Sequence, residues 1–292
     1  MLGKNQKLRL LIIGLITMTI VTTAIAGCTN RQNERENLTA FVGAASKPAM
    51  DEAAEAFEAK TGIKIYCTYG GSGAILSQME LSKTGDLYIP GSPDYIAKAE
   101  RRNVIDVKTV KIISYLIPVI AVQHGNPKNI QSLADLVKPD IKIGIGNPEA
   151  VCLGLYSIEL MNYNGLLTDI SKNIITQAES CEKTATLISL KSVDAVIGWH
   201  VFHDWDPDNI DVIYLKPEQL PRIAYVPAAI SAFSREKENA QRFIDFLISK
   251  QGQDIFNKWG YISTESEARN FAPKAAIGGE YQLPENYKAL VQ

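Results

Sequence analysis

Cysteine and histidine are scarce in this sequence of 292 residues, which contains 4 cysteines and 3 histidines. After Cys28 only Cys67, Cys152 and Cys181 remain, and an odd number of cysteines cannot pair completely into disulfides. No cysteine and histidine spacing typical of a four-ligand zinc site is present. We therefore expect a fold that does not depend on disulfides, with neither a resident metal ion nor another cofactor.

A surplus of basic residues is also absent. The 30 lysines and arginines are balanced by 32 aspartates and glutamates, which gives a formal net charge of −2. Nucleic-acid binding favours a strongly basic surface. The charge balance therefore argues against a nucleic-acid partner.

The Gly-x-Ser-x-Gly turn that carries the nucleophile of α/β hydrolases is missing as well. His200 and His203 are not placed by the sequence to activate a serine. Together with Asp204 they lie in the segment 199–208, whose spacing fits neither a calcium loop nor a zinc-protease helix. We expect a solvated loop there and a protein that is not an enzyme, with an extracytoplasmic hydrolase as an alternative.

An apolar run follows a basic start at the N-terminus and ends in small residues before Cys28. This order is typical of a secretory signal. It predicts a lipoprotein signal peptide over residues 1–27 and lipidation of Cys28, whereas an uncleaved anchoring helix is the alternative. Residues 28–36 lack apolar periodicity, so we expect them to tether the body to the outer face of the cell membrane.

Beyond residue 37, short β-rich runs alternate with helical patterns. The first example is a strand over 38–42, followed by a helix that begins after Ser46 and closes at Thr61-Gly62. This alternation predicts an α/β fold with largely parallel sheets, whose ligands bind beyond the carboxyl ends of the strands. The other predicted strands are 63–69, 86–89, 112–122, 142–145 and 194–199.

Small or hydroxyl residues occupy four of the predicted helix starts. A helix start presents free backbone N–H groups and partial positive charge, so several that converge would bind an anion through neutral donors. Ser46 and Ser72 are also common helix caps, and the turns alone leave a purely structural role open. The four starts are Ala45-Ser46, Gly71-Ser72-Gly73, Val151-Cys152-Leu153-Gly154 and Ser180-Cys181.

Several separated segments resemble, in order and spacing, the molybdate-binding proteins of ABC importers. The resemblance implies a two-lobed type II periplasmic-binding-protein-like fold, in which each lobe is a mixed, mainly parallel sheet flanked by helices. Lobe one would comprise 37–117 and 223–292, lobe two 118–222, with two hinge crossovers between them. The matching segments are 38–46, 69–73, 126–130, 147–149 with Gly154 and Tyr156, and 194–199.

The resemblance also implies which residues bind the ligand, molybdate or tungstate. Ser46 and Ser72 match serines that donate through the hydroxyl and the backbone N–H. Leu153 and Cys181 match residues that donate a backbone N–H alone. Trp199 stands where the family commonly has a tyrosine, and its indole can donate but not accept.

An archaeal branch of the family adds carboxylates that enlarge the coordination of the bound metal. Val151 stands where one of them would lie, and Glu218 is a candidate for the other. With one carboxylate missing, we expect a four-coordinate, tetrahedral oxyanion. If Leu153 and Cys181 contact one small anion, Cys152 and Cys181 must be neighbours, and we hypothesise that their thiols lie within bridging reach.

The sequence thus predicts a monomeric extracytoplasmic lipoprotein that binds molybdate or tungstate and delivers it to an ABC transporter permease. A binding protein of the same fold for sulfate, phosphate or an organic anion is the main alternative. A structural or adhesive lipoprotein is a further one.

Overall fold

The computed structural model describes residues 37–285 and Tyr287. The predicted signal peptide, the lipidation residue Cys28 and the tether lie outside the described residues. Within the described part of the chain, no helix is long and apolar enough to cross a membrane.

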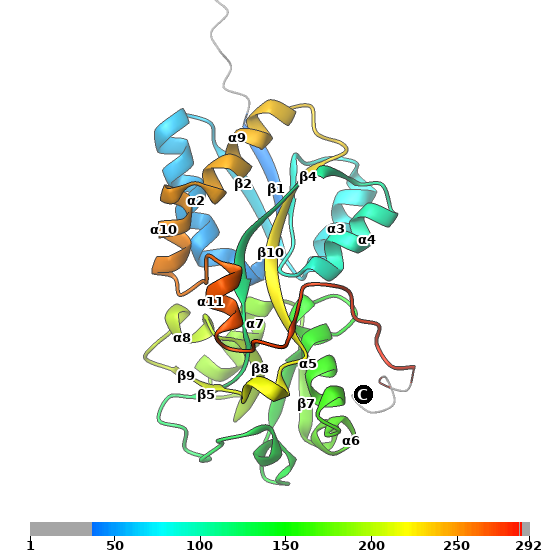
Figure 1. Cartoon of the computed structure of the whole chain (residues 1–292), viewed down its shortest axis with the longest axis vertical. Helices are drawn as coiled ribbons and strands as arrows, with labels where there is room; N and C mark the ends of the chain where they lie inside the picture. Colours follow the sequence, from blue (N-terminus) through cyan, green and yellow to red (C-terminus); the bar gives the residue numbers. More distant parts are fainter. Residues whose placement is uncertain (1–36, 286, 288–292) are drawn as a thin grey trace, which may run out of the picture. The chain divides into compact units, whose positions relative to one another are not determined.

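Two mixed β-sheets organise this part of the chain (Figure 1). The first has the order β11-β10-β3-β1-β2, with β4 paired to β10, and the second has the order β7-β6-β8-β5-β9. The strands of the first sheet are β1 (Leu38–Gly43), β2 (Ile65–Gly70), β3 (Leu87–Ile89), β4 (Ile105–Leu116), β10 (Arg222–Ser231) and β11 (Ala276–Ile277). Those of the second are β5 (Pro118–Gln123), β6 (Ile143–Gly146), β7 (Ile174–Ala178), β8 (Ala195–Trp199) and β9 (Ile210–Tyr214).

Parallel pairing dominates where helices follow strands. β1 is parallel to β2 and β3, and β6 is parallel to β7 and β8. β10 runs antiparallel to β3 and β4, as does β5 to β8 and β9. The carboxyl ends of β1 and β2 therefore meet at one edge of the first sheet, and those of β6 and β7 at one edge of the second.

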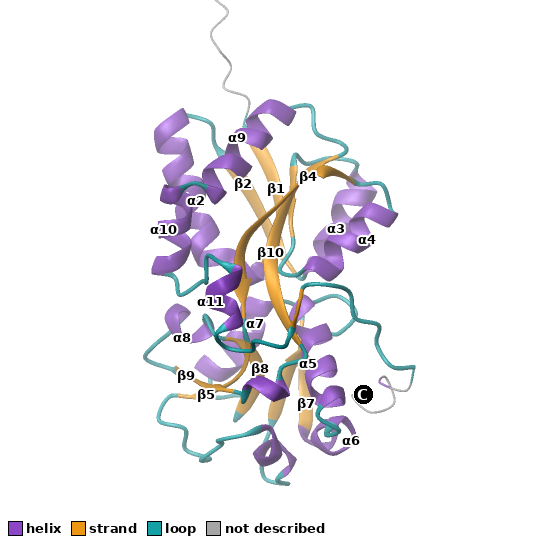
Figure 2. Cartoon of the chain, viewed as in Figure 1, coloured by secondary structure: helices purple, strands orange, loops and turns teal. Residues whose placement is uncertain are grey.

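Helices cover both sheets (Figure 2). α2 ends as its sequence predicts, because Gly62 adopts a left-handed φ of 72° and donates its N–H to the Glu58 carbonyl at 2.7 Å. The helices beside the first sheet are α2 (Lys47–Thr61), α3 (Ser72–Ser82), α4 (Pro93–Arg101), α9 (Lys237–Ile248) and α10 (Lys250–Lys258). The other α-helices of the described residues are α5 (Cys152–Tyr163), α6 (Leu167–Ile170), α7 (Cys181–Ser189), α8 (Phe202–Trp205) and α11 (Glu265–Arg269). The short 3₁₀ helices in the same part of the chain are η1 (Ala44–Ser46), η2 (Leu133–Val137), η3 (Ser171–Asn173) and η4 (Pro217–Gln219).

The single strand predicted over 112–122 is wrong, because two strands of different sheets share this run. Leu116 of β4 pairs with Ala224, whereas Pro118 of β5 pairs with Trp199. Ile117 between them is fully buried, so the apolar pattern continues through the crossover without a visible break. The loop predicted over 199–208 is also wrong in part, since α8 forms there and Phe202 is fully buried.

Two clusters of buried apolar side chains form the core. The first gathers around the first sheet and extends to Leu153 and Trp199, which belong to elements of the second sheet. The second surrounds the second sheet and includes Ala268 and Ala272 from the C-terminal region. The two sheets therefore share one continuous apolar contact, and the lobe boundaries stay a prediction.

Candidate functional site

Four helix starts lie at the carboxyl ends of strands: α2 follows β1 through η1, α3 follows β2, α5 follows β6 and α7 follows β7. Among the described residues, α2, α3 and α5 begin without a side-chain cap. α7 is different, because the Ser180 hydroxyl accepts the Lys183 N–H at 3.1 Å. In these three helices the N-cap residue therefore leaves the first-turn N–H groups without a side-chain cap.

The start of α3 contacts the starts of α5 and α7. The Gly73 N–H donates to the Ala150 carbonyl at 2.8 Å. A Cβ at Gly71 would lie 2.7 Å from the carbonyl oxygens of both Ala150 and Glu179. Glycine is therefore needed at position 71, where elements of the two sheets approach each other at backbone distance.

Ser46 and Ser72, the two predicted hydroxyl donors, are both buried at this contact. The Ser46 Oγ donates weakly to the Gly43 carbonyl at 3.3 Å, and the Ser72 Oγ accepts the Gly91 N–H at 3.0 Å. A Cβ at Gly43 would lie 3.0 Å from the Ser72 Oγ, so the two serine turns are adjacent. Their role as ligand donors stays a prediction.

Cys152 and Cys181 bring the starts of α5 and α7 together. Their sulfurs lie 3.7 Å apart and both are free thiols, which agrees with the hypothesis that the two residues are neighbours. A Cβ at Gly91 would lie 2.7 Å from the Cys152 Sγ, so this thiol also reaches the turn between β3 and α4.

The two thiols differ in acidity. Burial alone would raise the pKa of Cys181, but its thiolate form is stabilised by the Cys152 thiol, the nearby Trp199 indole N–H and the Leu153 and Cys181 backbone N–H groups, and these groups lower the pKa. The hydrogen bond to Cys181, and then burial, raise the pKa of Cys152. Leu153, Cys181 and Trp199, three of the predicted donors, therefore converge on one point, which the Cys181 sulfur occupies.

Two buried donors at this point lack partners. The Trp199 Nε1 and the Tyr156 hydroxyl make no hydrogen bond within the described part of the chain. Their rings pack edge to face with centroids 5.1 Å apart. An unsatisfied buried donor costs about 1–3 kcal/mol, so this pair favours a bound acceptor.

Tyr156 was not among the predicted site residues. It lies four residues after Cys152 on α5, on the same helix face, and this spacing is the signal that could have identified it.

A buried ion-pair network borders Tyr156. The Arg222 guanidinium lies 3.0 Å from an Asp94 oxygen and 2.7 Å from a Glu159 oxygen, with its central carbon 4.2 Å from the Tyr156 ring centroid. Burial raises the pKa of Glu159 despite the nearby arginine. Because two carboxylates face one cation, the network supplies no net positive charge to an anion.

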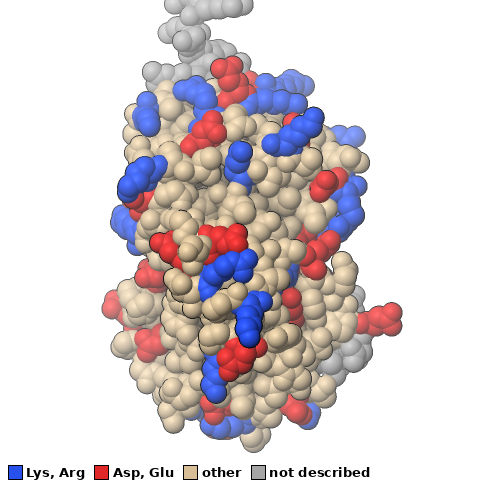
Figure 3. All heavy atoms as spheres, viewed as in Figure 1, with Lys and Arg blue, Asp and Glu red and all other residues tan. Residues whose placement is uncertain are grey.

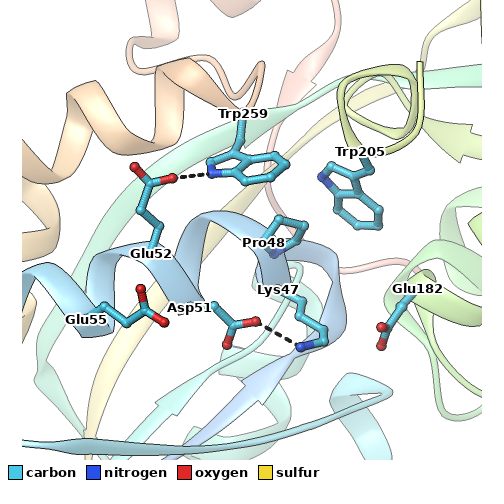
Figure 4. Close-up of a pocket in the computed structure, with 8 residues that line it drawn as sticks. All are labelled: Lys47, Pro48, Asp51, Glu52, Glu55, Glu182, Trp205 and Trp259. Atoms are coloured by element: carbon cyan, nitrogen blue, oxygen red, sulfur yellow. Dashed lines mark hydrogen bonds and ion pairs between the residues drawn. The ribbon is translucent and has the colours of Figure 1, made fainter. Parts of the chain in front are cut away.

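A pocket of about 670 Å³ opens at the first turn of α2 and beside that of α7 (Figure 4). The Lys47 side chain lines this pocket, and its ammonium pairs with Asp51 at 2.8 Å. Three further carboxylates and two tryptophans line it, namely Glu52, Glu55, Glu182, Trp205 and Trp259. This acidic lining disfavours an anion, so the buried junction of the helix starts around Cys152 and Cys181 is the better candidate site.

The two positions at which the sequence was compared with carboxylates of the archaeal branch lie apart. Val151 is the buried residue before α5 and lies at this helix start, whereas Glu218 is exposed on η4. The His200 Nδ1 accepts the Ile117 N–H at 3.1 Å and its Nε2 donates to the Gly260 carbonyl at 3.0 Å. His200 is therefore a buried structural link between chain segments.

Charged side chains are interspersed on the face of the molecule drawn in Figure 3. Basic and acidic groups alternate there without a large patch of one sign, in keeping with the net charge of −2.

Comparison with known proteins gives consistent matches. The model of the bacterial extracellular solute-binding protein family matches residues 38–262. A protein of Haemophilus influenzae, described only as a binding protein, is 27% identical over 227 residues, or 76% of this chain and 89% of that protein. The molybdate-binding protein ModA of Rhodobacter capsulatus is 20% identical over 214 residues, or 71% of this chain and 81% of that protein.

Solved structures match over most of the chain. The sulfate-binding protein SubI of Mycobacterium tuberculosis superposes with a TM-score of 0.71 at 17% identity, covering 83% of this chain and 93% of that one. The type II periplasmic-binding-protein fold expected from the sequence is thereby confirmed.

Proposed function

Because the chain belongs to the bacterial extracellular solute-binding protein family, we propose that it binds a tetrahedral oxyanion, molybdate or tungstate, at the meeting helix starts. Membership makes it a solute-binding protein of the ABC-transporter type that works outside the cytoplasm. The choice of anion and the residues that hold it are our proposal. Its main support is the pair of buried, unpartnered donors, the Trp199 Nε1 and the Tyr156 hydroxyl.

Ser46, Ser72, Leu153, Cys181 and Trp199 would donate to the oxyanion. The buried serine hydroxyls and the uncapped starts of α3 and α5 support this set. Hydrogen bonds to a charged group are worth about 1.5–3 kcal/mol each. Roughly six of them outweigh an association cost of about 4–15 kcal/mol, so no lysine or arginine has to contact the ligand.

Sulfate is the second candidate, because the structurally similar SubI is named for it. The same neutral donors could hold either dianion. Sulfate has shorter bonds to oxygen, so donors fixed at the larger radius of molybdate would lose length and alignment with it. Phosphate carries a proton near neutral pH, and a site lined only by donors would repel that O–H group.

Isothermal titration of the purified protein with molybdate, tungstate, sulfate and phosphate tests the proposal. We expect tight binding of molybdate and tungstate, weaker binding of sulfate and no measurable heat with phosphate. Tighter binding of sulfate than of molybdate would make sulfate the ligand in place of molybdate. Absence of binding to all four anions would refute both.

Two serine variants test the site itself. Ser46→Ala and Ser72→Ala should each weaken molybdate binding by about 1.5–3 kcal/mol, the value of one hydrogen bond to a charged group. Ser266→Ala, an exposed serine on α11, is the matched control and should bind like the unchanged protein. Unchanged affinity in both site variants would exclude Ser46 and Ser72 from the binding site.

We also propose that the lipid on Cys28 anchors the monomeric protein beside the permease that receives the anion. Cys28 lies outside the described residues. Metabolic labelling with a radioactive fatty acid should mark the unchanged protein and leave Cys28→Ser unlabelled. Equal labelling of both proteins would contradict the anchor.

A further inference from the structure

The thiols of Cys152 and Cys181 form an isolated pair at the junction of the helix starts. Their sulfurs lie 3.7 Å apart, and the two side chains are 1% and 2% exposed. Each cysteine is the first residue of its helix, α5 and α7 respectively. A disulfide requires about 2.05 Å between sulfurs, so a small approach of the two helix starts would complete the bond.

The Cys181 sulfur lies among groups that stabilise negative charge. It faces the Cys152 thiol, the Trp199 indole and the Leu153 N–H, and these contacts lower its pKa against the effect of burial. A helix start adds the partial positive charge that favours a thiolate. Cys181 therefore has the surroundings of an attacking sulfur, and Cys152 those of its partner.

We propose that Cys152 and Cys181 are a redox-active dithiol, and that its thiolate form and the bound anion compete for the same donors. The competition rests on the function proposed above, whereas the dithiol chemistry does not. Trp199 and Leu153 would donate to the anion when the site is filled and to the Cys181 thiolate when the site is empty and this thiol ionises. Filling the site therefore slows oxidation of the pair.

The oxidant that the reaction needs is a low-molecular-weight disulfide such as oxidised glutathione. When the empty site opens and admits oxidised glutathione, the Cys181 thiolate attacks one glutathione sulfur, the glutathione S–S bond breaks and one glutathione thiolate leaves. This thiolate takes the proton of Cys152, and the Cys152 sulfur then attacks Cys181 in the mixed disulfide and releases the second glutathione thiolate. Two protein thiols are oxidised to one disulfide, and one glutathione disulfide is reduced to two thiols.

The reactivity of the Cys152–Cys181 pair can be measured separately from that of Cys67, the remaining thiol of the described residues. Cys67 lies on β2, and burial raises its pKa to about 11, so it should react slowly. Cys67→Ser is therefore the matched control, because it removes a cysteine without touching the pair.

The test incubates the reduced full-length protein with oxidised glutathione and counts thiols after denaturation, with and without molybdate. Without molybdate, the unchanged protein and Cys67→Ser should each lose both thiols of the pair and regain them on reduction. Cys152→Ser and Cys181→Ala should form no intramolecular disulfide, and circular dichroism establishes that both variants are folded. With saturating molybdate, oxidation should slow by roughly tenfold or more, within the usual range of coupling between two ligands.

The outcomes are distinguishable. Unchanged thiol counts, or a disulfide that involves Cys67, would overturn the dithiol. If the disulfide forms at equal rates with and without molybdate although calorimetry detects molybdate binding, the competition is overturned and the proposed function stands. If calorimetry detects no anion while the disulfide forms, the proposed function falls and the dithiol stands.

Discussion

Acidification should destabilise the protein through the buried His200. The ring is 5% exposed, and its two nitrogens accept from the Ile117 N–H and donate to the Gly260 carbonyl. This arrangement requires the neutral ring with its proton on Nε2. Burial accordingly lowers the pKa of His200 to about 4 from its ordinary value of 6.5.

The direction and size of the effect follow from proton linkage. Between pH 6.5 and 4 the unfolded chain binds a proton at His200 that the folded chain does not, so the free energy of unfolding falls as the pH falls. One pKa unit corresponds to about 1.4 kcal/mol. The depressed pKa therefore costs about 2 kcal/mol on going from pH 7 to pH 4.5, and the loss levels off below pH 4.

Urea unfolding at a series of pH values measures this loss. Carboxylates also titrate in this range, so the informative quantity is the difference between the unchanged protein and His200→Gln, which cannot titrate. The stability of the unchanged protein should fall more steeply, by about 2 kcal/mol between pH 7 and 4.5. His124→Gln replaces an exposed histidine and is the matched control for the substitution. Parallel curves for the unchanged protein and His200→Gln would refute the reasoning.

Three further substitutions probe the site and the core. Trp199→Phe removes the unpartnered indole donor and should weaken molybdate binding by about 1.5–3 kcal/mol in calorimetry; equal affinity would exclude Trp199 from the site. Arg222→Met leaves Asp94 and Glu159 buried without their cation, and urea unfolding should detect a loss of about 3–5 kcal/mol, whereas a negligible loss would show that the pairs add little. Phe57→Ala opens a cavity where the ring packs on α9 and should cost about 3–5 kcal/mol by the same measurement; a loss below about 1 kcal/mol would mean that the core closes the gap.

Local patterns in the sequence were sufficient for most of the fold. The helix from Lys47 to Thr61 and its glycine stop follow from apolar spacing and from the conformational freedom of Gly62. The sequence predicted one strand over 112–122 because apolar residues are continuous through this run. The structure instead has two strands there, and they belong to different sheets. The apolar pattern of a segment indicates that the segment is buried, but it does not indicate to which sheet the segment belongs.

The candidate site was harder to predict than the fold. Helix starts could be located from turn residues, and the resemblance to a known family selected Ser46 and Ser72. The sequence did not predict the ion pairs of Arg222, because its partners Asp94 and Glu159 lie 128 and 63 residues away in the chain. Contacts at such separations depend on tertiary structure, and a single sequence contains no local signal for them.

The two chain crossovers lie side by side, since Leu116 at the end of β4 pairs with Ala224 near the start of β10. Arg222 lies two residues before Ala224 and joins α4 to α5 through its carboxylate partners Asp94 and Glu159. Any motion that separates α4 from α5 would therefore pull a desolvated cation away from its counterions, and both ion pairs would oppose it.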